Sequence, residues 1–315
     1  MFKLFNHPRS TLPQVQKNDL ITINLLGKGR FGEVHFGCFK GEPVAIKKLL
    51  NNSPAENEAE IKLHASLSHP NIVSAFARYD SPENDVYLIL EFMNGKDLFD
   101  CLVHDEQKTM LSLRMRVSIA KNIIDALTYL HETVHILHRD IKPENILLNQ
   151  HMQAKLCDFG LALSIDDSNQ TRSSGTPDYA APELFITGAR NTTTTDNYAL
   201  GVTIFVLMTI TPPSELHTID IDKRMMLHVN AVPLDIAKAF KNLVLNSTAH
   251  NPRDRMSLSD MSKLTDAIES LLNTIQPLSH IAPDETSVPT EHISDAVDEV
   301  SDQLDETSDY SCGMS

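Results

Sequence analysis

The chain has 315 residues, enough for one large domain or two moderate ones with a substantial core. Hydrophobic residues make up 41% and charged residues 22%, a composition typical of soluble globular proteins. The formal net charge of −15 argues against a nucleic-acid-binding protein. No apolar run approaches the roughly 18 residues of a membrane span.

The cysteine pattern indicates the compartment in which the protein works. The chain has four cysteines, and none forms a CxxC pair or a metal-ligand spacing. Such usage is typical of a reducing compartment, and the first residues carry too short an apolar run for a secretory signal. We therefore expect a cytoplasmic protein without a membrane span. A secreted effector that acts in a host cytosol is the alternative.

The first half of the chain predicts an arm and then several strands. Residues 1–18 are polar and interrupted by proline, which predicts a flexible arm. Apolar and polar residues alternate over 34–38 with the period of two that a half-buried strand shows. Apolar runs at 44–46 and 86–90 predict two more strands, with a helix between them near 55–66.

The pattern becomes helical after about Lys96. Apolar residues recur at helical spacing over 120–130, and further helices are expected near 196–208, 234–245 and 257–272. Strands followed by helices predict an α+β fold with a small β-rich lobe and a larger, mainly helical lobe.

The expected domain spans 19–273, with the β-rich N-lobe at 19–93 and the helical C-lobe at 94–273. The remaining segment, 274–315, differs sharply in composition. From Gln276 onward it carries ten acidic residues and no Lys or Arg. A segment of this kind cannot bury enough apolar surface to fold alone, so we expect a disordered acidic tail.

Part of this tail has a helical apolar pattern. Four apolar residues recur at 4-3-4 spacing, which suits a short amphipathic helix that docks on a partner or on the domain. They are Ile293, Val297, Val300 and Leu304. Partner docking and an address function are therefore alternatives to a purely solvated tail.

A glycine-rich segment is the first candidate site. Residues 27–34 read GKGRFGEV, and the glycines of this GxGxxGxV pattern let backbone N–H groups approach phosphates. A dinucleotide-binding turn shares GxGxxG but leads into a helix, whereas here a strand and then Val-Ala-Ile-Lys47 follow. Lys47 ends a buried strand and needs an anionic partner. Glu60 on the next helix is the expected one, and Glu58 is the alternative.

The segment HRDIKPEN at 138–145 is the most specific motif. We expect Asp140 to accept the proton of a substrate hydroxyl and Lys142 to steady the transferred phosphate. Asn145 and the Asp158 of an Asp-Phe-Gly segment offer two oxygen ligands of the kind that Mg²⁺ prefers.

In this order, the motifs resemble those of the eukaryotic-type serine/threonine protein kinase family over about residues 19–273. The resemblance implies the bilobal protein kinase fold, with ATP and Mg²⁺ as cofactors and a protein substrate that offers a Ser or Thr acceptor. It implies a catalytic set of Asp140, Lys142, Lys47 and Glu60. It also implies a nucleotide-binding set of Leu26, Gly27, Lys28, Gly29, Phe31, Gly32, Val34, Ala45, Lys47, Leu90, Glu91, Met93, Asn145, Leu147 and Asp158.

Further segments extend the resemblance. Gly175 and Thr176 are similar to the serine/threonine branch, in which the threonine hydrogen-bonds the catalytic aspartate and lysine. Glu183, in an Ala-Pro-Glu segment, is expected to pair with Arg255. The tight turn before Val-Ala-Ile-Lys and the Leu-His-Glu segment resemble the tyrosine-kinase-like group. Tyr198 stands where the family usually has Trp.

One departure from the family concerns activation. Four residues after Glu60 the family normally has a bulky apolar residue that stacks on Phe159 and His138, and here the residue is His64. This argues against a constitutively assembled active state. A pseudokinase scaffold is the rival reading that His64 favours, and a small-molecule kinase is disfavoured by the Ala-Pro-Glu segment.

Control by phosphorylation is the second expectation about activation. Arg139, next to Asp140, can receive a phosphate from the activation loop. The candidate acceptors are Ser168, Thr171, Ser173 and Ser174, of which Thr171 and Ser173 are favoured.

Overall fold

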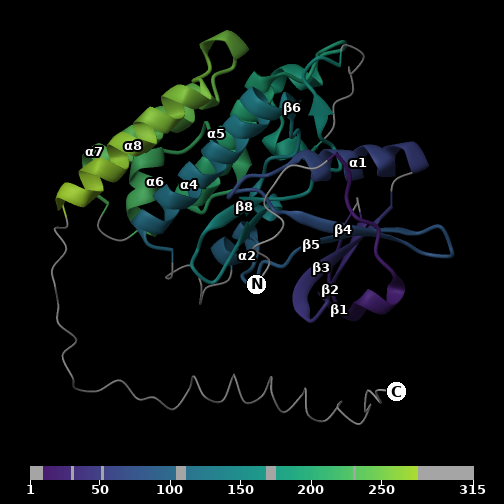
Figure 1. Cartoon of the computed structure of the whole chain (residues 1–315). Helices are drawn as coiled ribbons and strands as arrows, with labels where there is room; N and C mark the ends of the chain where they lie inside the picture. Colours follow the sequence, from purple (N-terminus) through teal and green to yellow (C-terminus); the bar gives the residue numbers. More distant parts are fainter. Residues whose placement is uncertain are drawn as a thin grey trace, which may run out of the picture. The chain divides into compact units, whose positions relative to one another are not determined.

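The structure, a computed structural model, describes residues 10–29, 32–50, 53–103, 111–167, 175–229 and 232–275 (Figure 1). The chain divides into two units, 1–275 and 276–315. The predictions for the acidic tail, for Phe31 and for the four loop acceptors fall on positions outside the described residues. The description below concerns the first unit.

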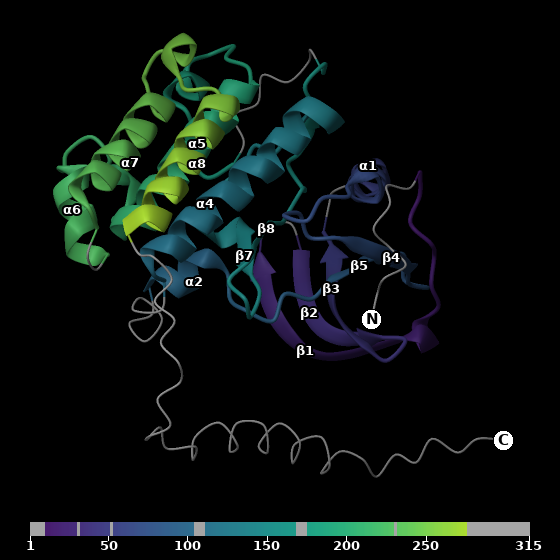
Figure 2. The same cartoon turned by 60° about the vertical axis from the view of Figure 1, so that its left-hand side comes forward.

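The N-lobe is built on a five-stranded antiparallel sheet with strand order β1-β2-β3-β5-β4 (Figure 2). The strands are β1 Leu20–Gly29, β2 Gly32–Phe39, β3 Glu42–Leu49, β4 Ala75–Asp80 and β5 Val86–Glu91. A two-residue turn joins β2 to β3, with Lys40 at φ 52° and Gly41 at φ 83°. Two left-handed residues define the hairpin turn whose twist matches that of the flanking strands.

Helix α1, Pro54–Ser66, covers one face of this sheet. Ser53 caps its N-terminus by accepting a hydrogen bond from the Glu56 amide, 3.2 Å away, and Pro54 fills the first helical position. Both features are typical helix-start signals. The helix begins only five residues after β3 ends, so it lies close above the strand that carries Lys47.

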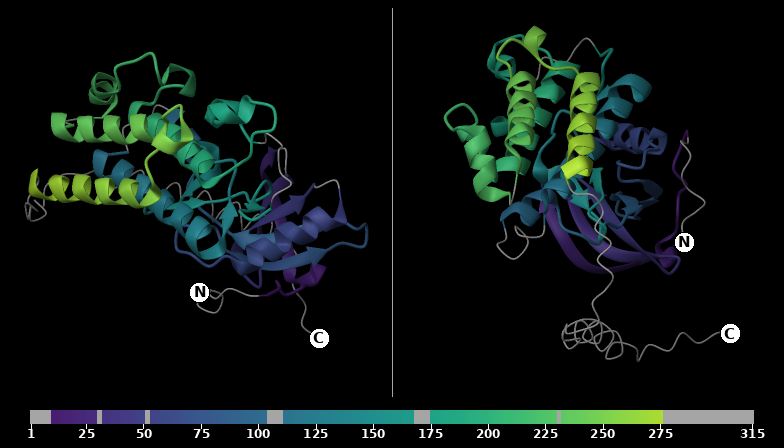
Figure 3. Two further views of the ribbon diagram at one scale, coloured as in Figure 1. Left: turned by 90° about the horizontal axis from the view of Figure 1, so that it is seen from above. Right: turned by 90° about the vertical axis from the view of Figure 1, so that its left-hand side faces the viewer.

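The C-lobe is mainly helical (Figure 3). Its helices are α2 Leu98–Val103, α4 Leu113–Thr128, α5 Thr193–Thr209, α6 Ile221–His228, α7 Leu234–Ser247 and α8 Leu258–Ile275. Short strand pairs, β6 Ile136–Leu137 with β9 Leu163–Ser164 and β7 Ile146–Leu148 with β8 Ala154–Leu156, lie between α4 and α5 in the chain. Helix α5 is buried over most of its length and forms the centre of the lobe.

These lobes confirm the predicted α+β bilobal architecture. None of the helices in the described part of the chain combines the length and apolarity that a bilayer crossing requires. Residues 138–145 connect β6 to β7 and residues 157–162 connect β8 to β9, and these two segments carry most of the polar residues considered next.

Two residues of the segment predicted as a flexible arm are in contact with the N-lobe. Leu12 and Val15 are buried in the N-lobe, with 6% and 9% of their surface exposed. Proline and polar residues dominate the local sequence, so the pattern gave no sign that two isolated apolar side chains find a tertiary partner.

Candidate active site

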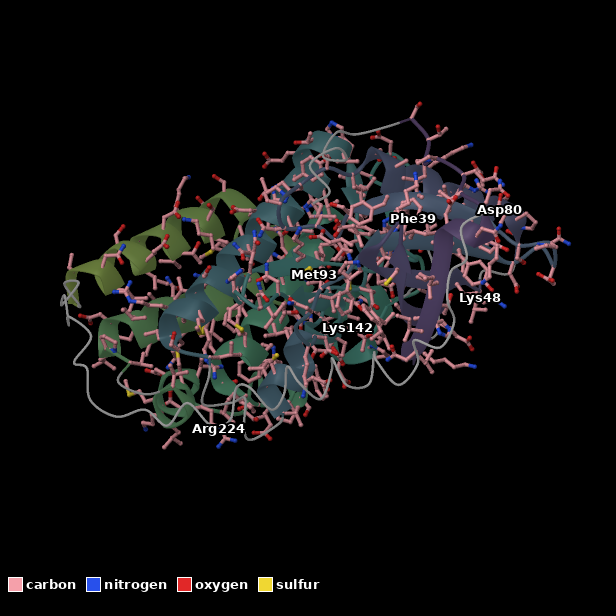
Figure 4. All side chains as sticks on the ribbon, turned by 60° about the horizontal axis from the view of Figure 1, so that its bottom comes forward. Phe39, Lys48, Asp80, Met93, Lys142 and Arg224 are labelled. Carbon is pink, nitrogen blue, oxygen red and sulfur yellow. The ribbon has the colours of Figure 1, made fainter. Side chains whose placement is uncertain are left out.

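A cavity of about 600 Å³ lies between the lobes, a size that suits a small-molecule ligand. Figure 4 shows Met93 and Lys142 near the middle of the molecule, between the sheet and the C-lobe helices. All the predicted nucleotide-binding residues that the structure describes line the cavity. They are Leu26, Gly27, Lys28, Gly29, Gly32, Val34, Ala45, Lys47, Leu90, Glu91, Met93, Asn145, Leu147 and Asp158.

The glycines of the β1–β2 hairpin serve two different purposes. A Cβ on Gly32 would lie 2.3 Å from the Lys48 carbonyl oxygen, so the pairing with β3 requires glycine there. A Cβ on Gly27 or Gly29 would meet nothing within 4 Å. Packing within the described chain therefore does not explain these two glycines, and the space beside them is open for a ligand.

Lys47 is a buried cation held by two carboxylates. Its Nζ lies 2.9 Å from Glu60 Oε1 and 2.8 Å from Asp158 Oδ1. Burial by itself lowers the pKa of Lys47, but the charges of Asp158 and Glu60 outweigh burial and raise the pKa above its usual value. Burial has the opposite effect on an acid and raises the pKa of Asp158. The charge and hydrogen bond of Lys47 outweigh burial, so the net pKa of Asp158 lies below its usual value. The lysine is therefore charged, and it joins β3, α1 and the segment after β8.

Glu58, the alternative partner for Lys47, points elsewhere. Its Oε2 accepts a hydrogen bond from Arg78 on β4 at 2.7 Å. Glu60 is two residues further along the helix and is 5% exposed, whereas the Glu58 side chain is 42% exposed. Two residues correspond to about 200° of helical rotation, so the two glutamates lie on different faces of α1.

Three polar side chains surround the carboxylate of Asp140 in the predicted catalytic loop, residues 138–145. Oδ1 of Asp140 accepts a hydrogen bond from the Thr176 hydroxyl at 2.8 Å. Oδ2 lies 2.9 Å from Lys142 Nζ and 3.0 Å from Asn145 Nδ2. Lys142 also donates to Thr176 Oγ1 at 2.7 Å, so the aspartate, lysine and threonine form a closed ring of contacts. This ring fixes the orientation of the carboxylate.

Gly175 allows the segment that carries Thr176 to approach the backbone of Arg139 closely. Its φ is 100°, which L side chains rarely adopt, and a Cβ there would lie 2.4 Å from the Arg139 carbonyl oxygen. Glycine is therefore required before Thr176 on both conformational and steric grounds.

Asp196, in the first turn of α5, binds the backbone of the predicted catalytic loop. Its carboxylate accepts hydrogen bonds from the backbone N–H groups of His138 and Arg139 at 2.8 and 2.9 Å. It also lies 2.9 Å from His131 Nε2. Burial raises the pKa of Asp196, but the hydrogen bond and charge of His131 lead the effects that bring the net pKa below its usual value. A buried anion thus holds the backbone on which Asp140 is mounted.

The activation segment is anchored to the C-lobe by Glu183 and Arg255. The guanidinium donates two parallel hydrogen bonds to the carboxylate, at 2.7 and 2.6 Å. The same guanidinium stacks 4.9 Å from the centre of the Tyr198 ring. Tyrosine at this position, where the family usually has tryptophan, therefore retains an aromatic face for the arginine.

His64 occupies the stack behind Glu60. Its ring meets Phe159 edge to face at 5.2 Å between centroids, and Phe159 meets His138 at 5.1 Å. His64 is 3% exposed, and neither ring nitrogen has a hydrogen-bond partner within the described chain. Burial lowers the pKa of His64 to about 4, so the ring is neutral near pH 7. The stack thus contains two buried ring nitrogens without hydrogen-bond partners among the described residues.

The sequence did not predict the role of Lys155, which links the C-lobe to the hinge, the connection between the lobes that begins at Glu91. Its Nζ contacts both carboxylate oxygens of Glu91, at 2.6 and 2.8 Å. Lys155 lies on β8 of the C-lobe and Glu91 ends β5 of the N-lobe, 64 residues apart. A lysine in an otherwise apolar three-residue strand was the available signal, but its partner could not be read from local sequence.

Comparisons with known proteins agree with this geometry. The protein kinase domain family matches residues 20–266. A probable serine/threonine-protein kinase of Dictyostelium discoideum is 31% identical over 80% of this chain and 42% of its own length. An Aurora kinase of Saccharomyces cerevisiae is 32% identical over 81% of this chain and 71% of its own length. Aurora kinase B of Mus musculus is 32% identical over 75% of this chain and 70% of its own length.

The chain therefore belongs to the eukaryotic-type serine/threonine protein kinase family. It spans less than half the length of the Dictyostelium relative. The assignment to the tyrosine-kinase-like group stays a prediction.

We expect His64→Leu to stabilise the protein and to raise its basal activity. Leucine replaces two buried nitrogens, which have no partner in the described chain, with apolar atoms, and this change is worth about 1–2 kcal/mol in unfolding free energy. Urea denaturation and the basal phosphorylation rate measure the two effects, and His151→Leu on the exposed surface is the control. An unchanged midpoint and rate would contradict this account of the stack.

The same substitution carries a pH signature. Unfolded His64 takes up a proton near pH 6.5, whereas in the folded protein it does so only near pH 4. Between these values the unfolded state binds more protons, so acidification over this range favours unfolding. The stability advantage of His64→Leu should therefore grow as the pH falls from 6.5 towards 4.

Proposed function

We propose that the protein transfers the γ-phosphate of ATP to serine or threonine residues of protein substrates, with Mg²⁺. The observation that supports this most strongly is the ion triad of Lys47, Glu60 and Asp158 at the edge of a nucleotide-sized cavity, beside the ring around Asp140. The first group suits binding of phosphates and a metal, and the second suits positioning of a hydroxyl.

The nucleotide would lie between the two lobes. Val34 and Ala45 from the sheet and Leu147 from β7 offer apolar surfaces for the two faces of the adenine ring. The backbone of Glu91 and Met93 would meet its polar edge, and Leu90 would border it at the back. Backbone amides of the β1–β2 hairpin would approach the phosphates, where the side of Gly27 and Gly29 is open. Lys47 would hold the α- and β-phosphates.

The residues present fit a magnesium site. Asp158 uses Oδ1 for Lys47 and the Gly160 amide, and Asn145 uses its Nδ2 for Asp140. Within the described chain, Asp158 Oδ2 and Asn145 Oδ1 take part in no hydrogen bond, and both residues line the cavity. Two such oxygens together with phosphate oxygens match the preference of Mg²⁺. When bound, the metal neutralises phosphate charge.

Asp140 would orient the acceptor hydroxyl and take its proton. Asp140 is 6% exposed and its carboxylate is held by Thr176 and Asn145, so little reorientation is needed when a substrate arrives. Lys142 lies beside it and would offset the negative charge of the transferred group. The Thr176 contact to both residues, together with Lys142 itself, favours serine and threonine over tyrosine as acceptors.

We further propose that the catalytic domain spans about 19–273, preceded by the docked segment 10–18. The acidic tail that follows would recruit a partner or set the location of the protein. We expect a protein that ends after Asn273 to keep its activity on a generic peptide within a few-fold.

Asp140→Asn should abolish phosphoryl transfer while nucleotide binding stays nearly intact, because this acid positions the acceptor and not the nucleotide. Lys47→Met should lower the transfer rate by about two orders of magnitude or more, with less effect on folding. Transfer of labelled phosphate to a peptide and calorimetric nucleotide titration measure the two properties. Asp235→Asn and Lys48→Met are the matched controls, and near-normal transfer by Asp140→Asn or Lys47→Met would overturn the proposal.

Control by the activation loop is the finer part of the proposal, based on Arg139. Phosphatase treatment should lower activity, and Thr171→Ala or Ser173→Ala should reproduce part of the loss, because a loop phosphate would pair with the guanidinium. Intact-mass spectrometry of the active enzyme checks this expectation. A fully active protein with an unmodified loop would refute it.

A further inference from the structure

The segment 10–16 lies before the part of the chain that the kinase family matches, which begins at residue 20. Leu12 and Val15 are nevertheless buried, whereas Thr11, Pro13 and Gln14 are exposed. Leu12 belongs to the buried cluster on the α1 side of the sheet, and Val15 belongs to a different cluster that includes Phe39 and Val44. The two side chains thus fix the segment to two separate apolar clusters of the N-lobe.

The backbone of this segment pairs with the edge strand of the sheet. The Val15 amide donates to the Arg78 carbonyl at 2.9 Å, and the Arg78 amide donates to the Pro13 carbonyl at 2.9 Å. Gln14 Nε2 adds a contact of 3.2 Å to Asp80 Oδ2 at the end of β4. Arg78 therefore has both of its backbone groups satisfied by the segment, which continues the sheet in parallel at β4.

Arg78 connects this edge to α1. Its guanidinium donates to Glu58 on the helix at 2.7 Å and is oriented by two contacts of 2.9 Å to Asp80. A second, apolar connection runs through Leu12, which shares its buried cluster with Ile61 and Ala65 of α1. Helix α1 also packs on β4, so the pairing of the segment with β4 adds a third link to the helix.

We propose that Leu12, Gln14 and Val15 are positioning residues that hold α1 in the place where Glu60 meets Lys47. The inference rests on the proposed function, since it concerns the catalytic use of that ion pair. Glu58 and Ile61 flank Glu60 in the sequence, and each is linked to the segment, the first through Arg78 and the second through the cluster of Leu12. Displacement of the segment leaves α1 free to move away, and the active state loses population.

The test uses the full chain with Leu12→Asp, the conservative variant Leu12→Met and the exposed neighbour Thr11→Ala as control. Leu12→Asp should lower kcat about tenfold with the peptide KM nearly unchanged, because fewer molecules have Glu60 in place. Leu12→Met and Thr11→Ala should keep kcat within about twofold, since they preserve the buried apolar contact or do not touch it. Glu58→Gln tests the polar link separately and remains informative if Leu12→Asp does not fold.

Hydrogen exchange separates positioning from general support of the fold. In Leu12→Asp the amides of α1, residues 54–66, should exchange faster, while those of α5 in the C-lobe stay protected. A variant with unchanged α1 exchange, or with a lower melting temperature but normal kcat in the folded protein, would overturn the proposal. A wild-type protein that transfers no phosphate would refute the proposed function instead, and the exchange of α1 would still decide whether the segment holds the helix.

Discussion

The burial of the Lys47 cation between Glu60 and Asp158 is the constraint on which the arrangement of this protein depends. A charge this deep in the protein is stable only with close partners, and each partner comes from a different part of the chain. Strand β3, helix α1 and the segment after β8 must therefore lie close enough for the three side chains to meet. The β1–β2 hairpin, the segment after β5 and the loop 138–145 line the rest of the cavity beside these three elements.

Several contacts outside the ion triad serve this arrangement. Asp196 holds the backbone of the catalytic loop, Arg255 holds the activation segment through Glu183, and Lys155 fastens the hinge to the C-lobe. His64 has the opposite effect, because two nitrogens that have no partner in the described part of the chain lie in the stack behind Glu60. The ion triad is thus assembled, but the stack behind Glu60 is less stable than an apolar stack would be. A contact elsewhere on the protein can therefore shift the position of α1.

The sequence predicts the order of elements and the residues at the cavity, because both depend on short, strongly patterned segments. The alternation at 34–38 lies within β2, and the helical spacing at 120–130 falls on α4 and on the π-helix Tyr129–Val134 that follows it. The docked segment around Leu12, the Glu91–Lys155 pair and the link between Arg78 and Glu58 were not predictable. Each joins positions at least 20 residues apart, and no local pattern specifies which distant group a single charged or apolar residue will meet.

A double-mutant cycle on Lys47 and Glu60 tests the central claim most directly. If the two residues act as one unit through their 2.9 Å contact, Lys47→Met and Glu60→Gln should each lower the phosphoryl-transfer rate. The double variant should then be no slower than the slower of the two single variants. Losses that simply add on a free-energy scale would contradict the account, because they would mean that the buried pair does not work as a single device.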